Sequence, residues 1–259
     1  MNESTVVKNI LDAAQPYLEG KNVKDLVIGI SLISCQLDDG SVGVSDVLRH
    51  GLPPACSAFA YAKSAIGRPA AEVAAWLMEK DDYIGRSVGS SVLSAASRGI
   101  DIPNDDNPDK MFGIDFVAGD TVGMIGLIGP VAKALQSRVK EVIVFDESVS
   151  AFGGNVMVCP MERQAELLPK CNKMIITGSS TINGSIDSLL SMCPQATEIA
   201  IVGSSTPMYP MGWIGTKVSS LSGSWWKDEY KDEIFKTISC GGGVMELQPY
   251  MIKKALYIK

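Results

Sequence analysis

Two stretches share one plan: Met174-Ile175-Ile176-Thr177-Gly178-Ser179-Ser180-Thr181 and Ile199-Ala200-Ile201-Val202-Gly203-Ser204-Ser205-Thr206 each run from a short apolar segment into Gly-Ser-Ser-Thr. Such runs are typical of buried parallel strands, and ligands of open α/β sheets bind just beyond the carboxyl ends of the strands. Glycine allows close backbone approach, while hydroxyls and free amides donate to oxyanions. The repeat predicts one pocket built from neighbouring strand ends. Ordinary turn chemistry and helix capping are the alternative.

The surrounding region, residues 106–259, alternates strand-like and helix-like segments, which predicts a Rossmann-like α/β domain with a mainly parallel sheet flanked by helices. We expect five or six strands. The expected strands are Thr121–Gly126, Glu141–Phe145, Lys173–Thr177, Glu198–Val202 and Ala255–Ile258, and the expected helices are Pro130–Ser137, Met161–Leu168, Ser185–Ser191 and Trp225–Thr237.

Residues 1–105 have a different order of elements, a β-hairpin followed by helices, which predicts a smaller α+β domain. Apolar residues recur at helical spacing over Thr5–Leu18. A hairpin is expected next, with strand-like runs Asp25–Leu37 and Ser41–Leu48 joined across Asp38-Asp39-Gly40. Helical segments follow, of which one, near residues 83–97, is rich in Ser, Ala and Gly and therefore suited to close packing. The polar stretch Asp101–Asp109, with two prolines, predicts the domain boundary.

Composition narrows the class of protein. The chain has 259 residues, enough for one large domain or two modest ones, and its net charge of −6 without a basic run argues against nucleic-acid binding. No apolar stretch reaches the length of a membrane span, and the first residues carry no signal-like core. We therefore expect a cytoplasmic protein with a small-molecule or metal ligand and no nucleic-acid or membrane partner. A homodimer is expected only from the frequency of symmetric oligomers.

Cysteine and histidine give little support for a structural zinc site. The six cysteines form no C-x-x-C pair, and His50 is the single histidine. Reduced, mostly buried thiols are the expectation. His50, near Cys56, could act as a general base or soft-metal ligand, although a lone histidine is more often structural.

A third glycine-rich turn lies at Gly123-Met124-Ile125-Gly126-Leu127-Ile128-Gly129, where a dinucleotide-binding fingerprint would lie. Its G-x-x-G-x-x-G spacing matches that fingerprint only in part. Asp146 and Glu147 end the next strand, at the place of a ribose-binding acid. Gly126 and Gly129 are therefore candidate ligand contacts, and a tight strand-to-helix turn is the alternative.

The two repeats are not equivalent. The first continues into Asn183, which could cap a helix or orient a ligand, while Pro207 fixes the loop after the second. Cys240-Gly241-Gly242-Gly243 could bring backbone close to a ligand or simply make a turn. The candidate ligand-binding residues are Gly126, Gly129, Asp146, Glu147, Gly178, Ser179, Ser180, Thr181, Asn183, Gly203, Ser204, Ser205, Thr206 and Gly242.

The order of these motifs resembles a family of proposed heavy-metal chelatases, in which an enolase-N-terminal-like domain precedes a Rossmann-like domain. The resemblance rests on residues 119–126, 177–187 and 202–207 and extends over most of the chain. It implies a pocket between the two domains, no enolase active site, and a heavy-metal ion as the candidate cofactor. Ser94-Ala95 stands where the family usually has an Asn-Ala pair facing the pocket.

These observations favour a protein that binds a small anionic or metal-chelating ligand between its domains, with heavy-metal chelation as its role. Asp146, Glu147 and Asp187 are the carboxylates near expected element ends that could bind metal or act as a base. One alternative is a nucleotide- or S-adenosylmethionine-binding enzyme that uses the Gly126–Gly129 turn. The other is a non-catalytic module that senses a small ligand. No catalytic residue is assigned from the sequence.

Overall fold

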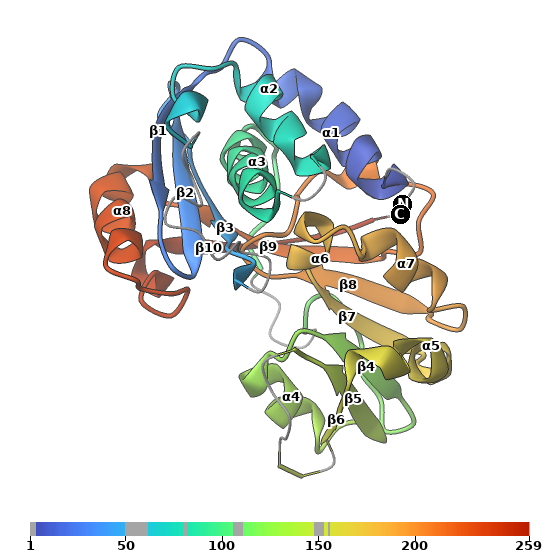
Figure 1. The fold of residues 1–259 in the computed structure, drawn as a ribbon. Helices are drawn as coiled ribbons and strands as arrows, with labels where there is room; N and C mark the ends of the chain where they lie inside the picture. Colours follow the sequence, from blue (N-terminus) through green and yellow to red (C-terminus); the bar gives the residue numbers. More distant parts are fainter. Residues whose placement is uncertain are drawn as a thin grey trace.

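The structure is a computed structural model that describes residues 4–49, 62–79, 82–105, 111–147, 153–154 and 156–258 (Figure 1). It contains two sheets. A three-stranded antiparallel sheet comprises β1 (Val23–Ile28), β2 (Leu32–Leu37) and β3 (Val42–Asp46). A seven-stranded sheet lies beside it and is formed by the second half of the chain.

The small sheet is covered by α1 (Thr5–Leu18), α2 (Ala70–Ala74) and α3 (Tyr83–Ala96) on one side and by α8 (Lys231–Ser239) on the other (Figure 1). The helix expected over Thr5–Leu18 is confirmed, with Ser4 as its N-cap. Small residues in α3 allow close packing: a β-carbon on Gly43 of β3 would lie 2.1 Å from the Ser91 carbonyl oxygen. The sheet therefore rests almost directly on the α3 backbone.

The hairpin turn at Asp38-Asp39-Gly40 is confirmed, and Gly40 adopts a φ of +94°. The expectation of one continuous strand over Asp25–Leu37 is wrong, because β1 and β2 are separate antiparallel strands. The chain turns between them at Gly29, where a β-carbon would lie 2.4 Å from the Ile238 carbonyl oxygen of α8. Apolar Ile28 and Ile30 flank this glycine, so the hydrophobic pattern conceals the turn.

The large sheet has the strand order β10-β9-β8-β7-β4-β5-β6. Its first six strands along the chain follow the 3-2-1-4-5-6 order of a Rossmann fold, and β10 pairs antiparallel with β9 at one edge. The strands are β4 (Thr121–Ile125), β5 (Glu141–Phe145), β6 (Val156–Cys159), β7 (Lys173–Thr177), β8 (Glu198–Val202), β9 (Ser220–Trp226) and β10 (Met251–Tyr257).

Helices cover both faces of this sheet, as the sequence predicts for an α/β fold. Buried residues of α4 pack against one face, and those of α5, α6 and α7 pack against the other. These helices are α4 (Gly129–Leu135), α5 (Gln164–Leu167), α6 (Ser179–Ile182) and α7 (Ile186–Ser191). Short 3-10 turns occupy Ala62–Ala65, Ala75–Met78, Ser97–Gly99, Met161–Arg163, Leu168–Lys170, Pro210–Trp213, Asp228–Tyr230 and Gln248–Tyr250.

Near the C-terminus the expectation of a helix beginning at Trp225 is wrong. Trp225 and Trp226 end strand β9, and the helix α8 begins only at Lys231. Serine occupies every second position at the start of β9, and a glycine lies between two of the serines. The sequence therefore has no apolar run there, although the strand is largely buried. Strand β6 was not expected either, because it is only four residues long.

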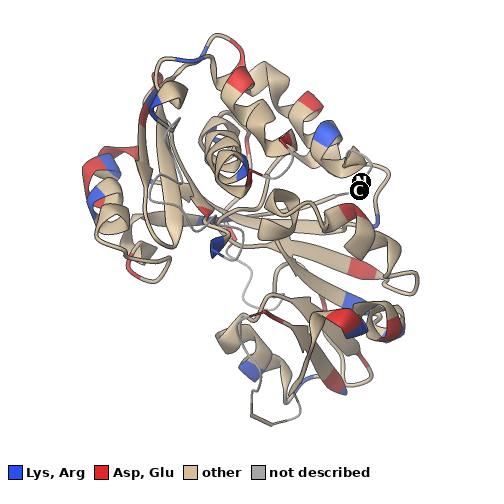
Figure 2. Cartoon of the chain, viewed as in Figure 1, with Lys and Arg blue, Asp and Glu red and all other residues tan. Residues whose placement is uncertain are grey.

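One hydrophobic core joins the two halves of the chain. Its members include Ile10 of α1 and Trp213 of the Pro210–Trp213 turn, and a β-carbon on Gly212 would lie 2.6 Å from the Ile10 Cα. The division into domains at residues 1–105 and 106–259 stays a prediction. Both signs of charge occur on the outer helix α8 (Figure 2). Among the helices of the described residues, none has the length and apolar character needed to cross a membrane.

Candidate functional site

The two Gly-Ser-Ser-Thr segments lie side by side, as expected, because β7 and β8 are adjacent parallel strands. The contact between them is made by backbone. A β-carbon at Gly178 would lie 2.5 Å from the Thr206 nitrogen and 2.6 Å from the Ser205 carbonyl carbon. Since a real β-carbon does not fit at that separation, the first glycine of the repeat is required for the two segments to meet.

The same tetrapeptide adopts two conformations. After Gly178, whose φ is −58°, the first copy forms the one-turn helix α6. After Gly203, whose φ is +111°, the second copy forms a turn. The two glycines are therefore needed for different reasons: one for a close approach and the other for a left-handed backbone.

Asp46, the last residue of β3 in the small sheet, joins the two segments. Ser179 Oγ donates to Asp46 Oδ2 at 2.6 Å, and Ser204 Oγ donates to Asp46 Oδ1 at 3.1 Å. The Asp46 amide in turn donates to Ser205 Oγ at 2.8 Å. One carboxylate from one sheet is thus held by both copies of the repeat from the other sheet.

The remaining hydroxyls of the repeats differ in their partners. Thr181 Oγ1 donates to the Gly178 carbonyl at 2.8 Å, and Thr206 Oγ1 donates to the Ser222 carbonyl at 3.2 Å. These two contacts are turn and strand chemistry. Ser180 is fully buried, and its Oγ has no hydrogen-bond partner within the described chain. Asn183 is exposed and accepts a hydrogen bond from the Ser185 amide at 3.0 Å, which makes a local turn.

Arg86 of α3 lies against the first segment. Its Nη2 donates to the Thr181 carbonyl at 3.2 Å, and its buried Nε has no partner among the described residues. Burial lowers the pKa of Arg86, since desolvation disfavours the charged form. Gly184, with a φ of +75°, borders the guanidinium, and a β-carbon there would lie 3.1 Å from Nη2.

The glycine turn after β4 is closed by a carboxylate. Leu127 donates its amide to Asp146 Oδ2 at 2.7 Å, and Gly126, with a φ of +80°, donates its amide to the Phe145 carbonyl at 2.8 Å. Gly129 begins α4, and Glu147 is exposed after β5. Asp146 and the glycine turn, which the sequence placed together, therefore bind each other.

The other candidates bind or contact groups other than the Asp46 carboxylate. Gly242 follows α8, and a β-carbon there would lie 2.5 Å from Thr237 Cγ2. Asp187 accepts hydrogen bonds from the Ser4 hydroxyl and from the Val6 amide, at the start of α1. Ser94 is nearly buried and accepts from the Val44 amide at 3.3 Å. His50 and Cys56 lie outside the described residues.

Four cysteines are buried and free, as the sequence predicts: Cys35, Cys159, Cys171 and Cys193. Burial raises the pKa of Cys35 to about 12, which keeps the thiol protonated. The described part of the chain contains no cluster of three or more His, Cys, Asp or Glu side chains suited to a metal ion.

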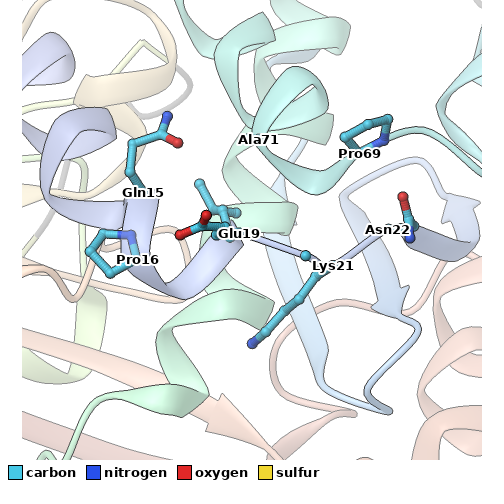
Figure 3. Close-up of a pocket in the computed structure, with 9 residues that line it drawn as sticks. Gln15, Pro16, Glu19, Lys21, Asn22, Pro69 and Ala71 are labelled. Carbon is cyan, nitrogen blue, oxygen red and sulfur yellow. The ribbon is translucent and has the colours of Figure 1, made fainter.

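Several cavities lie in the small-sheet half of the molecule, and two of them border the end of α1 or the hairpin turn. One, of about 640 Å³, is lined by residues from the end of α1, the start of β1 and the start of α2, including Gln15, Glu19 and Lys21 (Figure 3). Another, of about 320 Å³, is lined by residues that include Arg98 and Asp228, which form an ion pair at 3.1 Å. Neither is lined by the repeats or by Asp46.

Sequence reasoning missed Asp46 and Arg86. Asp46 offered a signal, because a polar residue ends an apolar strand there as it does in the repeats. Its partners, however, are 133 and 158 residues away in the sequence. Arg86 offered a weaker signal as the one charged residue of a helix otherwise made largely of small and apolar residues.

Comparisons with known proteins agree with this architecture. The DUF364 family model, described as "Putative heavy-metal chelation", matches residues 111–257, and a second model with the same description, DUF4213, matches residues 11–97. No curated protein matches the chain significantly.

Two solved structures have the same fold. A DUF364 protein of unknown function from Pyrococcus horikoshii is 20% identical, with a TM-score of 0.77 over 98% of this chain and 100% of that one. A second, from Desulfitobacterium hafniense, is 18% identical, with a TM-score of 0.74 over 96% of this chain and 98% of that one. Since one family model matches more than half of the sequence, the chain belongs to the DUF364 family, the family described as "Putative heavy-metal chelation".

Proposed function

We propose that this protein binds a small metal-chelating ligand at the junction of its two sheets, where Asp46 meets the two Gly-Ser-Ser-Thr segments. The observation that carries the proposal is the convergence of Ser179 and Ser204 on one carboxylate. This junction lies at the carboxyl ends of β7 and β8, the edge at which open α/β sheets bind ligands. The family description supports chelation as the role.

Asp46 has capacity for a ligand beyond its serine contacts. A carboxylate offers about four lone-pair sites, and the hydroxyls of Ser179 and Ser204 use one on each oxygen. Hydroxyl donors that hold a carboxylate in this way orient it, as outer-shell groups orient metal ligands. Asp46 can therefore accept a further donor or contact a metal ion while its orientation stays fixed.

The metal would be cargo rather than a resident cofactor. Asp46 supplies one carboxylate, and the described residues contain no cluster of three or more metal-binding side chains. A single carboxylate does not make a protein cage of the kind that holds structural metals. We therefore propose that most donors to the metal belong to a bound small molecule and that Asp46 takes a coordination position which that molecule leaves open.

Nucleotide binding has less support. In that hypothesis the Leu127 amide and Asp146 would face the nucleotide, but they are bonded to each other at 2.7 Å. We assign binding to the junction and no reaction. Titration with nucleotides and with a metal chelate distinguishes the nucleotide and sensing hypotheses from this one.

Thermal-shift and calorimetric titration with Ni²⁺–nitrilotriacetate tests the proposal, because that chelate leaves coordination positions open on the metal. We expect the chelate to stabilise the wild-type protein. Asp46→Asn should lose most of this stabilisation, and the double variant Ser179→Ala/Ser204→Ala should weaken it. Asp12→Asn is the matched control, since Asp12 is an exposed carboxylate paired with Lys8.

Equal stabilisation of wild type and Asp46→Asn would refute the proposed site. Stabilisation by nucleotides or S-adenosylmethionine alone, with none by the chelate, would favour the enzyme hypothesis instead. Binding of the chelate without turnover of any tested substrate would fit a sensing or carrier protein and leave the site assignment intact.

A further inference from the structure

Arg86 brings a positive charge to the junction. Within the part of the chain that the structure describes, no carboxylate forms an ion pair with it, and the Thr181 carbonyl is its hydrogen-bond acceptor. A guanidinium has five N–H donors, so one acceptor leaves most of them free. An unpaired charge in a partly buried position is costly, and such positions usually have a partner.

Two further observations indicate that the surroundings of Arg86 are suited to a ligand. The fully buried Ser180, which precedes Thr181, has an Oγ without a partner among the described residues. Gly184 has a left-handed backbone, and a side chain there would press on the guanidinium, since its β-carbon would lie 3.1 Å from Nη2. The chain thus makes room for Arg86, and the residue before its hydrogen-bond acceptor has a buried hydroxyl without a partner among the described residues.

Asp46 and Arg86 contact the same one-turn helix. Asp46 binds Ser179, and Arg86 binds Thr181, two residues further along α6. A helix of this length is only about 6 Å long at 1.5 Å per residue. Opposite charges therefore flank α6 without an ion pair between them, so that each can serve a different part of one ligand.

We propose that Arg86 recognises an acidic group of the ligand, a carboxylate or a phosphate, so that the ligand class is an acidic metal chelator. The inference rests on the proposed function, because it assigns the group that binds the acidic part of the same ligand. The planar guanidinium suits this role, since it pairs with carboxylate and phosphate through two parallel hydrogen bonds. The acidic arm of the chelator would meet Arg86 while its metal meets Asp46.

The test uses anions without a metal, so that its result does not depend on metal binding at Asp46. Isothermal titration with citrate, and separately with inorganic phosphate, compares the wild-type protein with Arg86→Gln and Arg86→Lys. We expect Arg86→Gln to weaken citrate or phosphate binding about 10- to 100-fold, the usual range for a lost charge-assisted contact. Arg86→Lys should retain part of the affinity, because it keeps the charge but not the planar fork.

Arg98→Gln is the matched control. Arg98 also has a buried Nε without a partner among the described residues, but its Nη2 is paired with Asp228 and its guanidinium stacks on Trp225. Its replacement should leave anion affinity unchanged. Equal affinity of wild type and Arg86→Gln, or no binding of either anion to the wild type, would overturn the inference.

A second measurement uses the wild-type protein alone and so tests the inference even if the Arg86 variants fail to fold. Dicarbonyl labelling of arginines in the wild-type protein, read out by peptide mass spectrometry, should show Arg86 protected by saturating citrate and Arg98 unaffected. Labelling of Arg86 that citrate does not change would overturn the inference. Anion binding that depends on Arg86, combined with chelate binding that ignores Asp46, would refute the proposed metal function and retain the anion site.

Discussion

Gly178 and Thr206 are in contact through their backbones, at a separation where a β-carbon on residue 178 would lie 2.5 Å from the Thr206 nitrogen. This contact allows the two copies of Gly-Ser-Ser-Thr to act as one unit. It places Ser179 and Ser204 on either side of the Asp46 carboxylate. The close approach of two glycine-led segments is therefore the structural basis of the candidate site.

Replacing Gly178 by alanine should separate the two segments. The new β-carbon meets backbone atoms, which cannot move aside as a flexible side chain can. We expect Gly178→Ala to lower the free energy of unfolding by about 1–3 kcal/mol, as overpacking does, and to weaken Ni²⁺–nitrilotriacetate binding as well. Chemical denaturation and calorimetric titration measure the two effects.

Gly119→Ala is the control for this substitution. No atom lies within 4 Å of a β-carbon at Gly119, and its φ is not in the left-handed region. Its stability should stay within about 0.5 kcal/mol of the wild type. If Gly178→Ala has the same free energy of unfolding as the wild type, the two segments are not held together by this contact.

Asp187→Ala should loosen the start of α1. The carboxylate accepts from the Ser4 hydroxyl and the Val6 amide and so fastens the first helix to α7. Loss of a capping contact of this kind costs about 1–2 kcal/mol. Hydrogen exchange should become faster in α1 first, while β7 and β8 stay protected.

Asp12→Ala is the comparison on the same helix. Asp12 is exposed and pairs with Lys8 four residues earlier, an interaction that contributes little to stability. Equal exchange in α1 for the two variants would mean that Asp187 does not anchor the helix.

Alkaline pH should destabilise the fold through Cys35. Its pKa is raised to about 12 by burial, while an exposed cysteine titrates near 9. Between these values the folded state retains a proton that the unfolded state releases, so stability falls as pH rises. This thiol alone should cost about 1.4 kcal/mol between pH 8 and pH 10.

Denaturation at a series of pH values checks this prediction. Cys35→Ala should be less stable at neutral pH but lose about 1.4 kcal/mol less than the wild type between pH 8 and pH 10. Val44→Ala, on the neighbouring strand, removes buried apolar volume without a titratable group. Its stability should run parallel to the wild-type curve, and a Cys35→Ala curve that also runs parallel would contradict the prediction.

The sequence by itself determined most of the secondary structure of the large sheet. The strands Glu141–Phe145, Lys173–Thr177 and Glu198–Val202 end where the apolar runs end. Local patterning suffices there, because a strand buried on both faces is a continuous apolar run bounded by polar or turn residues. Patterning failed at β9, where serines occupy a buried strand, and at Gly29, where apolar residues continue through a turn.

Only the tertiary structure decided which groups make the candidate site. The sequence placed Ser179 and Ser204 at strand ends, but their shared partner, Asp46, is 133 residues from one and 158 from the other. Arg86 meets Thr181 across 95 residues. Local propensity acts over a few residues, whereas these contacts depend on how separate elements pack. Gly43 lets β3, which ends at Asp46, lie close to α3, and Gly178 lets the two repeats meet.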